Sequence, residues 1–426
     1  MKKIIKIVCG LLLCPWLAMQ GQELQLSQEA CRQMALAHNE DLQKADNALR
    51  QAELDKAVAL AAFLPKVDGS LSGIYMSPDI EMSGMKLQMH GMYMAGVNVT
   101  QPLYTGGRLL AGRKLAGIGK ESAELQLNQT RQQVLADADQ AYWTLVSVQR
   151  KVRMLEAYER QMNALYDQVK LAVEAEMGTE NELLRIRAKR SEIQYQLQKA
   201  RNGSDLCRLA LCNVLGAELD TQIEPTDTLI QVCMPQQLDD DISLRPELAL
   251  LHKQIAAQQQ QLKMTRAGIL PTVGLSVGYS YYGNMKVVAA VGTENLHDGY
   301  FVAMASVSIP LFHWGENLKK IRRARYDIRN AELDLQKNSR LLSIEARQAV
   351  QNLTDGYTMV ETAELGRKEA IENLRVMQER YDVSMCTLTD LLDAQTQWQQ
   401  AESNFIEAQT QYKIYETEYK RTTGRL

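Results

Sequence analysis

The chain has 426 residues, with 48 basic and 51 acidic side chains and a formal net charge of −3. This near balance of charge makes nucleic acid an unexpected partner. Beyond residue 21 no stretch approaches about eighteen consecutive apolar residues, so we expect no transmembrane helix.

Residues 1–21 have the pattern of a secretory signal peptide. Lysines precede the apolar run Ile7–Leu17, which is too short to span a membrane. Cys9 and Cys14 lack the small preceding residue of a bacterial lipidation site. We therefore expect an exported, unlipidated product.

The rest of the chain is an internal duplication. Pro102-Leu103-Tyr104 matches Pro310-Leu311-Phe312, and Gly216 matches Gly424, each pair being 208 positions apart. Self-similarity at a fixed distance indicates repeated structural units. We divide the chain into a first repeat at residues 22–216, a connector at 217–242 and a second repeat at 243–426.

Each repeat is predicted to open with a helix and to continue into two strands. The helices begin near Ser27 and Ser243, and the first continues to about Ala62; a Leu-Pro step ends each. Apolar residues then alternate with polar or very small ones, as in a strand with two different faces. The predicted strands are residues 67–75, 93–100, 273–281 and 301–309. Residues 77–92 and 283–299 are expected to be outward loops, with a strand extension over residues 287–291 as the alternative.

The strands have the length and alternation of a transmembrane β-barrel, since about ten tilted residues cross a bilayer. Asn98 and Ser276 are expected on the polar face. Lipid is expected on the other face, at Val97, Val99, Leu275, Val277, Val307 and Ile309. The smallest common barrels need about eight strands, so several chains must each contribute a sheet.

A junction joins each second strand to a long helix. Pro102, Gly106 and Gly107 occupy the first junction, and Pro310 and Gly315 the second. We expect the prolines to end the strands and the glycines to permit a sharp change of direction.

The longest predicted helix covers residues 108–173, roughly 100 Å at 1.5 Å per residue. Apolar residues recur in it at every seventh position, and an uncharged stripe lies 208 residues later; this spacing marks a supercoiled helix. The two stripes are Leu127, Val134, Ala141, Val148, Leu155, Met162 and Val169, and Leu335, Leu342, Ala349, Gly356, Ala363, Ala370 and Met377. From the far ends, shorter helices of about 55 Å are predicted to return to Gly216 and Gly424.

This arrangement resembles the TolC-like outer-membrane efflux proteins. The resemblance rests on the strand, the Pro-Leu-aromatic step, the glycines and the long helix, all occurring twice after a signal peptide. It implies a mainly α fold with a transmembrane β-barrel portion: a homotrimer whose twelve-stranded barrel, four strands per chain, continues into a long periplasmic α-helical barrel. It also implies an exit duct in the outer membrane of a Gram-negative bacterium, working with a periplasmic adaptor and an inner-membrane pump.

The resemblance further assigns roles at the helix ends. The turns containing Gly178 and Thr179, and Thr387 and Leu388, would be the periplasmic tips that dock the adaptor. Asp390 and Asp393, together with Glu182, would form acidic rings that close the entrance. Thr387 and Asp390 also have the spacing of a capping box, so a purely structural role stays open. Residues Glu176 and Ser384 replace the usual turn glycines of the family.

Nothing in the sequence indicates an enzyme. The five histidines are scattered without ligand spacing, and no nucleophile motif or phosphate loop is present, so we expect no catalytic, cofactor or metal site. The five cysteines after residue 21 are irregularly spaced and predict no disulfide framework. The alternative function is an exported periplasmic coiled-coil adaptor or chaperone without a barrel, which leaves the paired strands unexplained.

Overall fold

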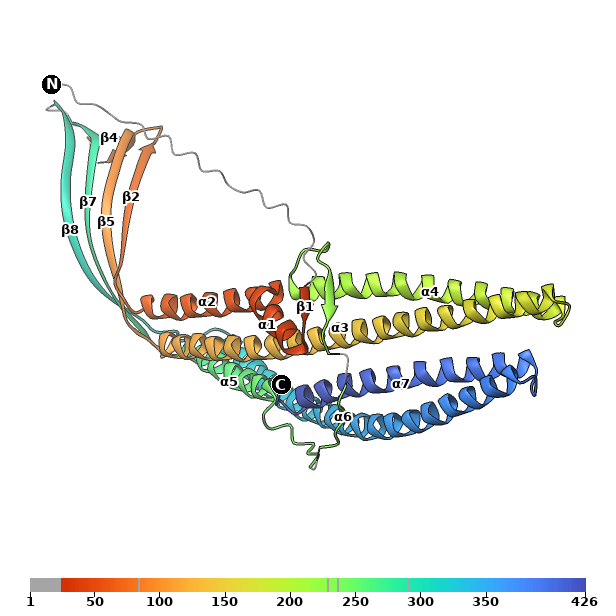
Figure 1. The fold of residues 1–426 in the computed structure, drawn as a ribbon. Coiled ribbons are helices and arrows are strands. Elements are labelled where there is room, and N and C mark those ends of the chain that lie inside the picture. Colours follow the sequence, from red (N-terminus) through yellow and green to blue (C-terminus); the bar gives the residue numbers. More distant parts are fainter. Residues whose placement is uncertain (1–23, 83–84, 228–229, 236, 290–291) are drawn as a thin grey trace, which may run out of the picture.

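The computed structural model describes residues 24–82, 85–227, 230–235, 237–289 and 292–426 (Figure 1). The predicted signal segment 1–21 lies outside this range. A curved antiparallel sheet occupies one end of the molecule, and long helices run from it to two turns at the other end. Among the described residues, no helix has both the length and the apolar character needed to cross a membrane.

The first repeat contains α1 (Gln28–His38), α2 (Glu40–Ala61), α3 (Arg108–Glu174) and α4 (Glu180–Leu215). We predicted one helix from Ser27 to Ala62, and this was wrong. Asn39 is extended, with ψ 128°, and its side-chain oxygen accepts hydrogen bonds from the amides of Asp41 and Leu42. Asn39 thus ends α1 and caps α2.

The second repeat contains α5 (Pro246–Ala267), α6 (Glu316–Asp382) and α7 (Leu388–Thr422). Helices α3 and α6 have 67 residues each and begin 208 positions apart, at Arg108 and Glu316. Helices α4 and α7 have 36 and 35 residues. The predicted duplication is therefore confirmed.

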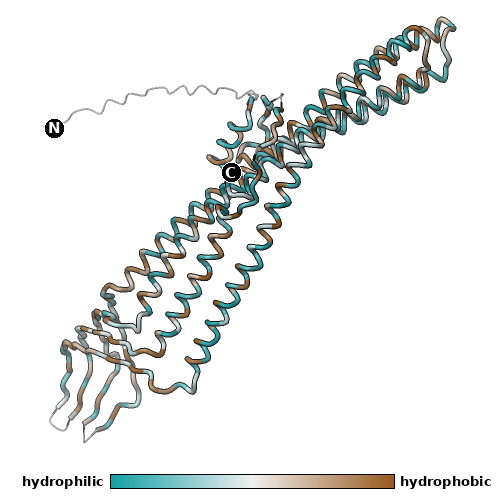
Figure 2. Tube along the Cα trace, turned by 90° about the horizontal axis from the view of Figure 1, so that it is seen from below, coloured by the Kyte–Doolittle hydropathy of each residue, from teal (hydrophilic) through white to brown (hydrophobic). Residues whose placement is uncertain are grey.

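The heptad stripes of α3 and α6 face inward. All fourteen stripe residues are buried or half-buried. Helix α3 packs along α4, and α6 packs along α7, as two antiparallel hairpins. Hydrophobic and hydrophilic residues alternate along these helices (Figure 2), so each hairpin is held together by one apolar seam.

Helices α4 and α7, which return from the far turns, stack end to end on the short helices of their own repeats. Gly216, at φ 63°, ends α4 against the backbone of His38, and Gly424, at φ 71°, follows α7 against the backbone of Leu244. A Cβ at either glycine would lie 2.7 Å from a backbone atom of its neighbour. Only glycine fits this conformation and this close approach.

The sheet contains β2 (Lys66–Tyr75), β5 (His90–Thr105), β7 (Thr272–Ala289) and β8 (Gly292–Ser308), paired in that order and antiparallel throughout. A small hairpin, β3 (Ile80–Met82) and β4 (Met85–Gln88), also pairs with the outer part of β7. The predicted outward loops therefore contain much of the sheet. The ladder of β7 and β8 resumes beyond an irregularity between Tyr282 and Met285, so the strands run longer than the alternation indicated.

The two repeats are joined in a region that we call the waist, which comprises a short two-stranded sheet and the buried polar contacts of Asp139. Strand β1 (Leu24–Leu26) pairs in parallel with β6 (Ile223–Pro225) of the connector. Asp139 of α3, only 1% exposed, accepts two hydrogen bonds from Arg32 of α1, at 2.8 and 2.6 Å, and one from Thr417 of α7 at 2.6 Å. One carboxylate thus joins three helices from both repeats.

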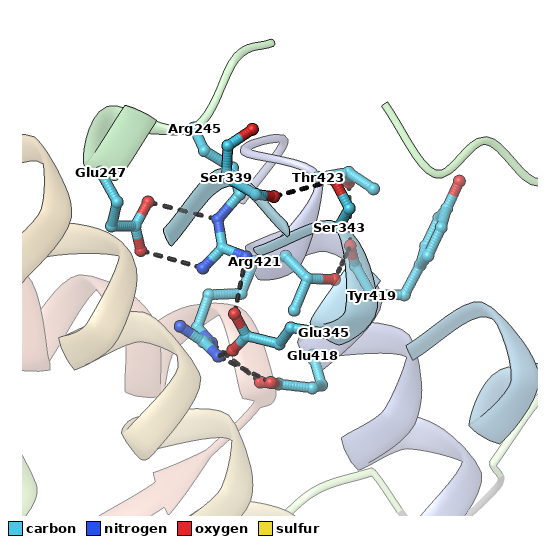
Figure 3. Close-up of polar contacts among 10 residues, drawn as sticks. Arg245, Glu247, Ser339, Ser343, Glu345, Glu418, Tyr419, Arg421 and Thr423 are labelled. Atoms are coloured by element: carbon cyan, nitrogen blue, oxygen red, sulfur yellow. Dashed lines mark hydrogen bonds and ion pairs between the residues drawn. The ribbon is translucent and has the colours of Figure 1, made fainter. Parts of the chain in front are cut away.

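A second polar cluster holds the start of α5 (Figure 3). The buried Arg245 donates to Glu345 of α6 at 2.7 Å and to Glu247 at 3.1 Å. Arg421 of α7 donates to the other oxygen of Glu345 at 2.6 Å. Burial acts to raise the pKa of Glu345, but the two guanidinium partners outweigh it and hold that pKa below its ordinary value.

Candidate functional site

The sheet has one apolar and one polar face, as predicted. The register aligns Val67, Val99, Val277 and Ala303 in one row across all four strands. The next row contains Asp68, Asn98, Gly278 and Val302, so its side chains point to the opposite face. The exposed apolar side chains of the first face include Val67, Leu71, Val97, Tyr279, Phe301 and Val307.

Three details of the sheet differ from expectation. Ile309 lies one residue beyond the end of β8. The polar face also carries exposed Val302 and Met304 on the edge strand β8. Pro102 does not end its strand: β5 continues to Thr105 across an irregularity between Pro102 and Tyr104. An irregular step in the ladder accommodates the missing N–H of proline.

The junction glycines have the geometry that a sharp turn requires. Gly107 and Gly315 are the N-caps of α3 and α6, in the left-handed region at φ 84° and 72°. Gly106 is also left-handed, and a Cβ there would lie 2.8 Å from the Ala267 oxygen. The equivalent residue of the second repeat is Trp314, at φ 48°. Strand β8 ends at Ser308, before Pro310, as predicted.

The two far turns share one backbone path. Glu176 and Ser384 are left-handed, at φ 57° and 59°. The amides of Met177 and Met385 close the turns with hydrogen bonds to Ala172 and Arg380, at 2.8 and 2.7 Å. The family's usual glycines are absent, yet the turn geometry is retained.

Each return helix begins with a capping box. Thr179 and Glu182 form the first, and Thr387 and Asp390 the second, with reciprocal side-chain and backbone hydrogen bonds. The hydrogen bonds from Thr387 lower the pKa of Asp390, so this exposed carboxylate is charged at neutral pH. Asp393 is exposed one turn further along α7. The capping role left open for Asp390 is therefore present.

The four residues predicted to dock the adaptor differ in their exposure to solvent. Thr179 and Thr387 are exposed and Gly178 is half-buried, but Leu388 is 2% exposed and belongs to a core. There Leu388 and Leu391 of α7 pack among Tyr158 and Met162 of α3 and Ile186 of α4. Arg185 of α4 donates a hydrogen bond to Thr389 of α7. The sequence did not predict that α7 packs against α3 and α4 here; the apolar spacing of Leu388, Leu391 and Leu392 was the only signal for it.

No group of three or more histidine, cysteine, aspartate or glutamate side chains suited to a metal ion occurs in the part of the chain that the structure describes. The features with functional geometry are the two-faced sheet, the junctions and the tips. Together they define an outer-membrane channel protein with a long helical extension.

Comparison with known proteins gives the family. The model of the outer membrane efflux protein family matches residues 31–217 and 238–425, most of the chain, and the chain belongs to this family. The alkaline protease secretion protein AprF of Pseudomonas aeruginosa is 22% identical over 394 residues, covering 89% of this chain and 80% of the relative. The outer membrane protein TolC of Vibrio cholerae is 20% identical over 381 residues, covering 86% and 83%. The fold also matches the Campylobacter jejuni CmeC outer membrane channel, with a TM-score of 0.78 at 20% identity, covering 93% of this chain and 85% of that one.

Proposed function

We propose that this protein is the exit duct of a tripartite efflux or secretion system. It carries small toxic compounds or a secreted polypeptide from an inner-membrane pump across the periplasm and the outer membrane. The observation that carries the proposal is the continuity of the sheet with the helices. An apolar-faced sheet leads through glycine junctions into helices of 67 residues, about 100 Å long. Family membership supports the same role.

The working unit is a homotrimer that closes a twelve-stranded barrel. In one chain β2 and β8 are the two edges of the main sheet, and each leaves backbone N–H and C=O groups unpaired. Lipid cannot satisfy these groups, so β8 must pair with β2 of the next copy. Helices α2 and α6 flank the same edges, and both expose apolar side chains, namely Leu54 and Val58 on α2 and Leu318, Tyr326 and Leu333 on α6. In a head-to-tail ring of copies, α6 of one chain packs against α2 of the next, and this contact buries both sets of apolar side chains.

The native mass of the complex in detergent tests this assembly. Three chains are expected per particle, and outer-membrane preparations should yield a band whose gel migration changes on boiling. A stable monomer that inserts into bilayers would contradict closure between chains. Growth of a deletion strain on a panel of toxic compounds, with the secreted proteins measured in parallel, would identify the cargo class.

The periplasmic tips dock the adaptor. Thr179 and Thr387 are exposed beside the two turns, at the end of the molecule farthest from the sheet. Cysteine at either position should cross-link to a co-expressed adaptor. Cysteine in place of Leu103 or Leu311, which are exposed at the two strand-to-helix junctions, is the matched control and should not cross-link. If the adaptor cross-links only to cysteine at the control positions, it binds near the sheet, and this would contradict docking at the tips.

The entrance is closed by rings of acidic side chains. Threefold symmetry would bring three copies each of Asp390 and Asp393 together at the tips, with Glu182 at the equivalent turn of the other hairpin. Like charges in such a ring bind cations and shape conductance.

The chain is organised as a first repeat at residues 22–216, a connector at residues 217–242 that lies at the waist, and a second repeat at residues 243–426.

A further inference from the structure

The sheet joins one repeat to another in two ways. Within one chain, β5 of the first repeat pairs with β7 of the second, and we call this ladder the internal seam. In the proposed homotrimer, β8 of one copy pairs with β2 of the next, and we call that ladder the seam between copies. The internal seam is therefore a template for the seam that a single chain cannot form.

The duplication fixes which residues of the two seams are equivalent. Strand β8 follows β5 by 208 positions, the distance from Pro102 to Pro310. Strand β7 follows β2 by 206 positions, the distance from Leu64 to Leu270. Helices α2 and α5 agree with the second offset, because both have 22 residues and they end 206 positions apart. Each residue of the internal seam can thus be converted into a residue of the seam between copies.

This conversion reproduces a ladder that the structure shows. Val67 of β2 lies opposite Val99 of β5. Their equivalents in the second repeat, Val273 of β7 and Val307 of β8, also lie opposite each other. The two hairpins therefore have the same register, and side chains that share a face in one hairpin share it in the other.

Applied to the internal seam, the conversion gives a register between copies. Val99 lies opposite Val277 in the internal seam, so Val307 is expected opposite Leu71 of the next copy. In the single chain Val307 and Leu71 are exposed, whereas Val99 and Val277 are half-buried. This register continues the apolar face from copy to copy, and a slip by one residue would turn apolar side chains to the polar face.

The unequal lengths of β5 and β8 agree with this register. Strand β5 continues to Thr105, because its last residues pair with the start of β7. Strand β8 ends at Ser308, although the residue equivalent to Thr105 is His313. Residues 309–313 have no ladder partner among the described residues of the single chain. Their partner in the register would be the start of β2 of the next copy, so β8 should lengthen in the assembly.

The two seams differ at the junction with the long helix. Gly106 of the first repeat is equivalent to Trp314 of the second. A Cβ at Gly106 would lie 2.8 Å from the Ala267 oxygen and 2.9 Å from the Leu270 Cβ. Ala267, the last residue of α5, is 3% exposed as a result of such close packing. A tryptophan has no room in the internal seam.

The matching surface of α2 is uncovered in the single chain. Ala61 and Leu64, which are equivalent to Ala267 and Leu270, are both exposed. Trp314 is 86% exposed and packs only edge to face on Phe312. Large exposed apolar side chains mark interaction sites. Because Trp314 has a Cβ, the end of α2 of the next copy must lie farther from the junction than α5 does, and the indole can fill that space.

We propose that the seam between copies repeats the register of the internal seam, with Val307 opposite Leu71 of the next copy, and that Trp314 packs over Ala61 and Leu64 of that copy. The inference rests on the proposed homotrimer and supplies its contacts. Trp314 makes the seams between copies unlike the internal seams, since its indole replaces a close glycine contact. Assembly thus depends on a side chain that the first repeat lacks.

Pairs of cysteines test the register. Val307→Cys is combined with Leu71→Cys, which the register places directly opposite, and separately with Gly69→Cys or Gly73→Cys, two positions to either side on the same face. A Cβ at either glycine meets nothing within 4 Å. Directly opposite Cβ atoms lie about 4.5–5.5 Å apart and diagonal residues about 7–8 Å, so only the first pair suits a disulfide.

Outer membranes containing each full-length variant are oxidised and analysed on denaturing gels without reductant. Single-cysteine variants control for the natural cysteines. The directly opposite pair should give covalent dimers and trimers, and the diagonal pairs should give none. Stronger cross-linking of a diagonal pair, or no cross-linking by any pair in a particle of three chains, overturns the register. A native mass of one chain would instead contradict the proposed homotrimer.

Trp314→Ala tests the junction, and Leu311→Ala is its matched control. Leu311 is exposed, and its equivalent Leu103 stays exposed beside the internal seam, so no contact with the next copy is expected there. Trp314→Ala should raise the rate at which the purified trimer dissociates in detergent by about tenfold, and Leu311→Ala by less than about twofold. Equal rates in the two variants overturn the role of Trp314. Trp314→Phe keeps an aromatic ring and should recover part of the loss; no recovery would mean that packing of the ring is not the cause.

Discussion

Glu176 and Ser384 adopt the same left-handed backbone conformation at equivalent positions of the two repeats, 208 residues apart. This conformation costs an L-residue about 1–2 kcal/mol, and glycine avoids that cost but loses about 0.5–1 kcal/mol of chain entropy on folding. Ser384→Gly should therefore stabilise the protein by about 0.5–1 kcal/mol. Thermal unfolding of the purified protein measures the gain.

Ser384→Ala is the control for this prediction, because it removes the hydroxyl but keeps the Cβ. It should give no gain. If alanine stabilises as much as glycine, the strain is not in the backbone. Glu176→Gly should behave like Ser384→Gly, since the two turns have the same hydrogen-bond pattern.

Adjacent residues of β7 should respond oppositely to arginine. Val277 lies in the apolar row with Val99 and Ala303, whereas Ser276 lies on the polar face, where it donates to Asn98 at 2.9 Å. Val277→Arg should cost about 2–4 kcal/mol near the middle of the bilayer, and Ser276→Arg much less. Chemical unfolding from lipid vesicles measures both. Equal costs would mean that the sheet does not face lipid.

Capping and gating by Asp390 can be separated by the choice of substitution. Asparagine at Asp390 and Asp393 removes charge but keeps an oxygen that can accept the bonds from Thr387. The double asparagine variant should keep its thermal stability while its conductance or its block by divalent cations changes. The double alanine variant should also lose the half of the capping box that Asp390 supplies, at about 1 kcal/mol per chain. If both variants conduct like the parent protein, neither carboxylate takes part in gating.

Removing Arg32 should destabilise the waist strongly. The nearly fully buried Asp139 would keep only its bond from Thr417 and would lose its counter-charge. Breaking one side of a buried ion pair costs about 3–5 kcal/mol. Arg32→Met should therefore lower the unfolding temperature more than Arg32→Met combined with Asp139→Leu. A double variant no more stable than the single one would show that the ion pair is not the source of the cost.

Acid should weaken the cluster around Glu345. The pKa of this carboxyl is lower in the folded protein than its ordinary value of 4.5, since the bonds from Arg245 and Arg421 outweigh its burial. Its contribution to stability is thus complete above pH 4.5 and is lost as the pH falls through the folded value. The stability difference between the parent and Glu345→Gln should shrink below pH 4.5. A difference that is constant down to that range would contradict the role of the charge.

The sequence by itself determined the features that repeat along the chain. The seven-residue stripes predicted α3 and α6, and the alternation around Val97 and Leu275 predicted which side chains share a sheet face. The return to Gly216 and Gly424 predicted the stacked helices. These signals are local, because side-chain direction follows from 3.6 or 2 residues per turn. They do not resolve where backbone pairing continues past the alternation. The outer half of β8 was therefore mistaken for a loop, and in β7 only residues 287–291 were considered as an extension.

Only the tertiary structure decided which distant residues meet. Arg32 and Asp139 are 107 positions apart, and Arg185 and Thr389 are 204 apart; no periodicity relates either pair. Leu388 illustrates the limit, since a helix-start position at a tip looked exposed until the packing of α7 against α3 and α4 buried it. Burial depends on which neighbours the whole chain supplies, and that information is not carried by the spacing of residues within one helix.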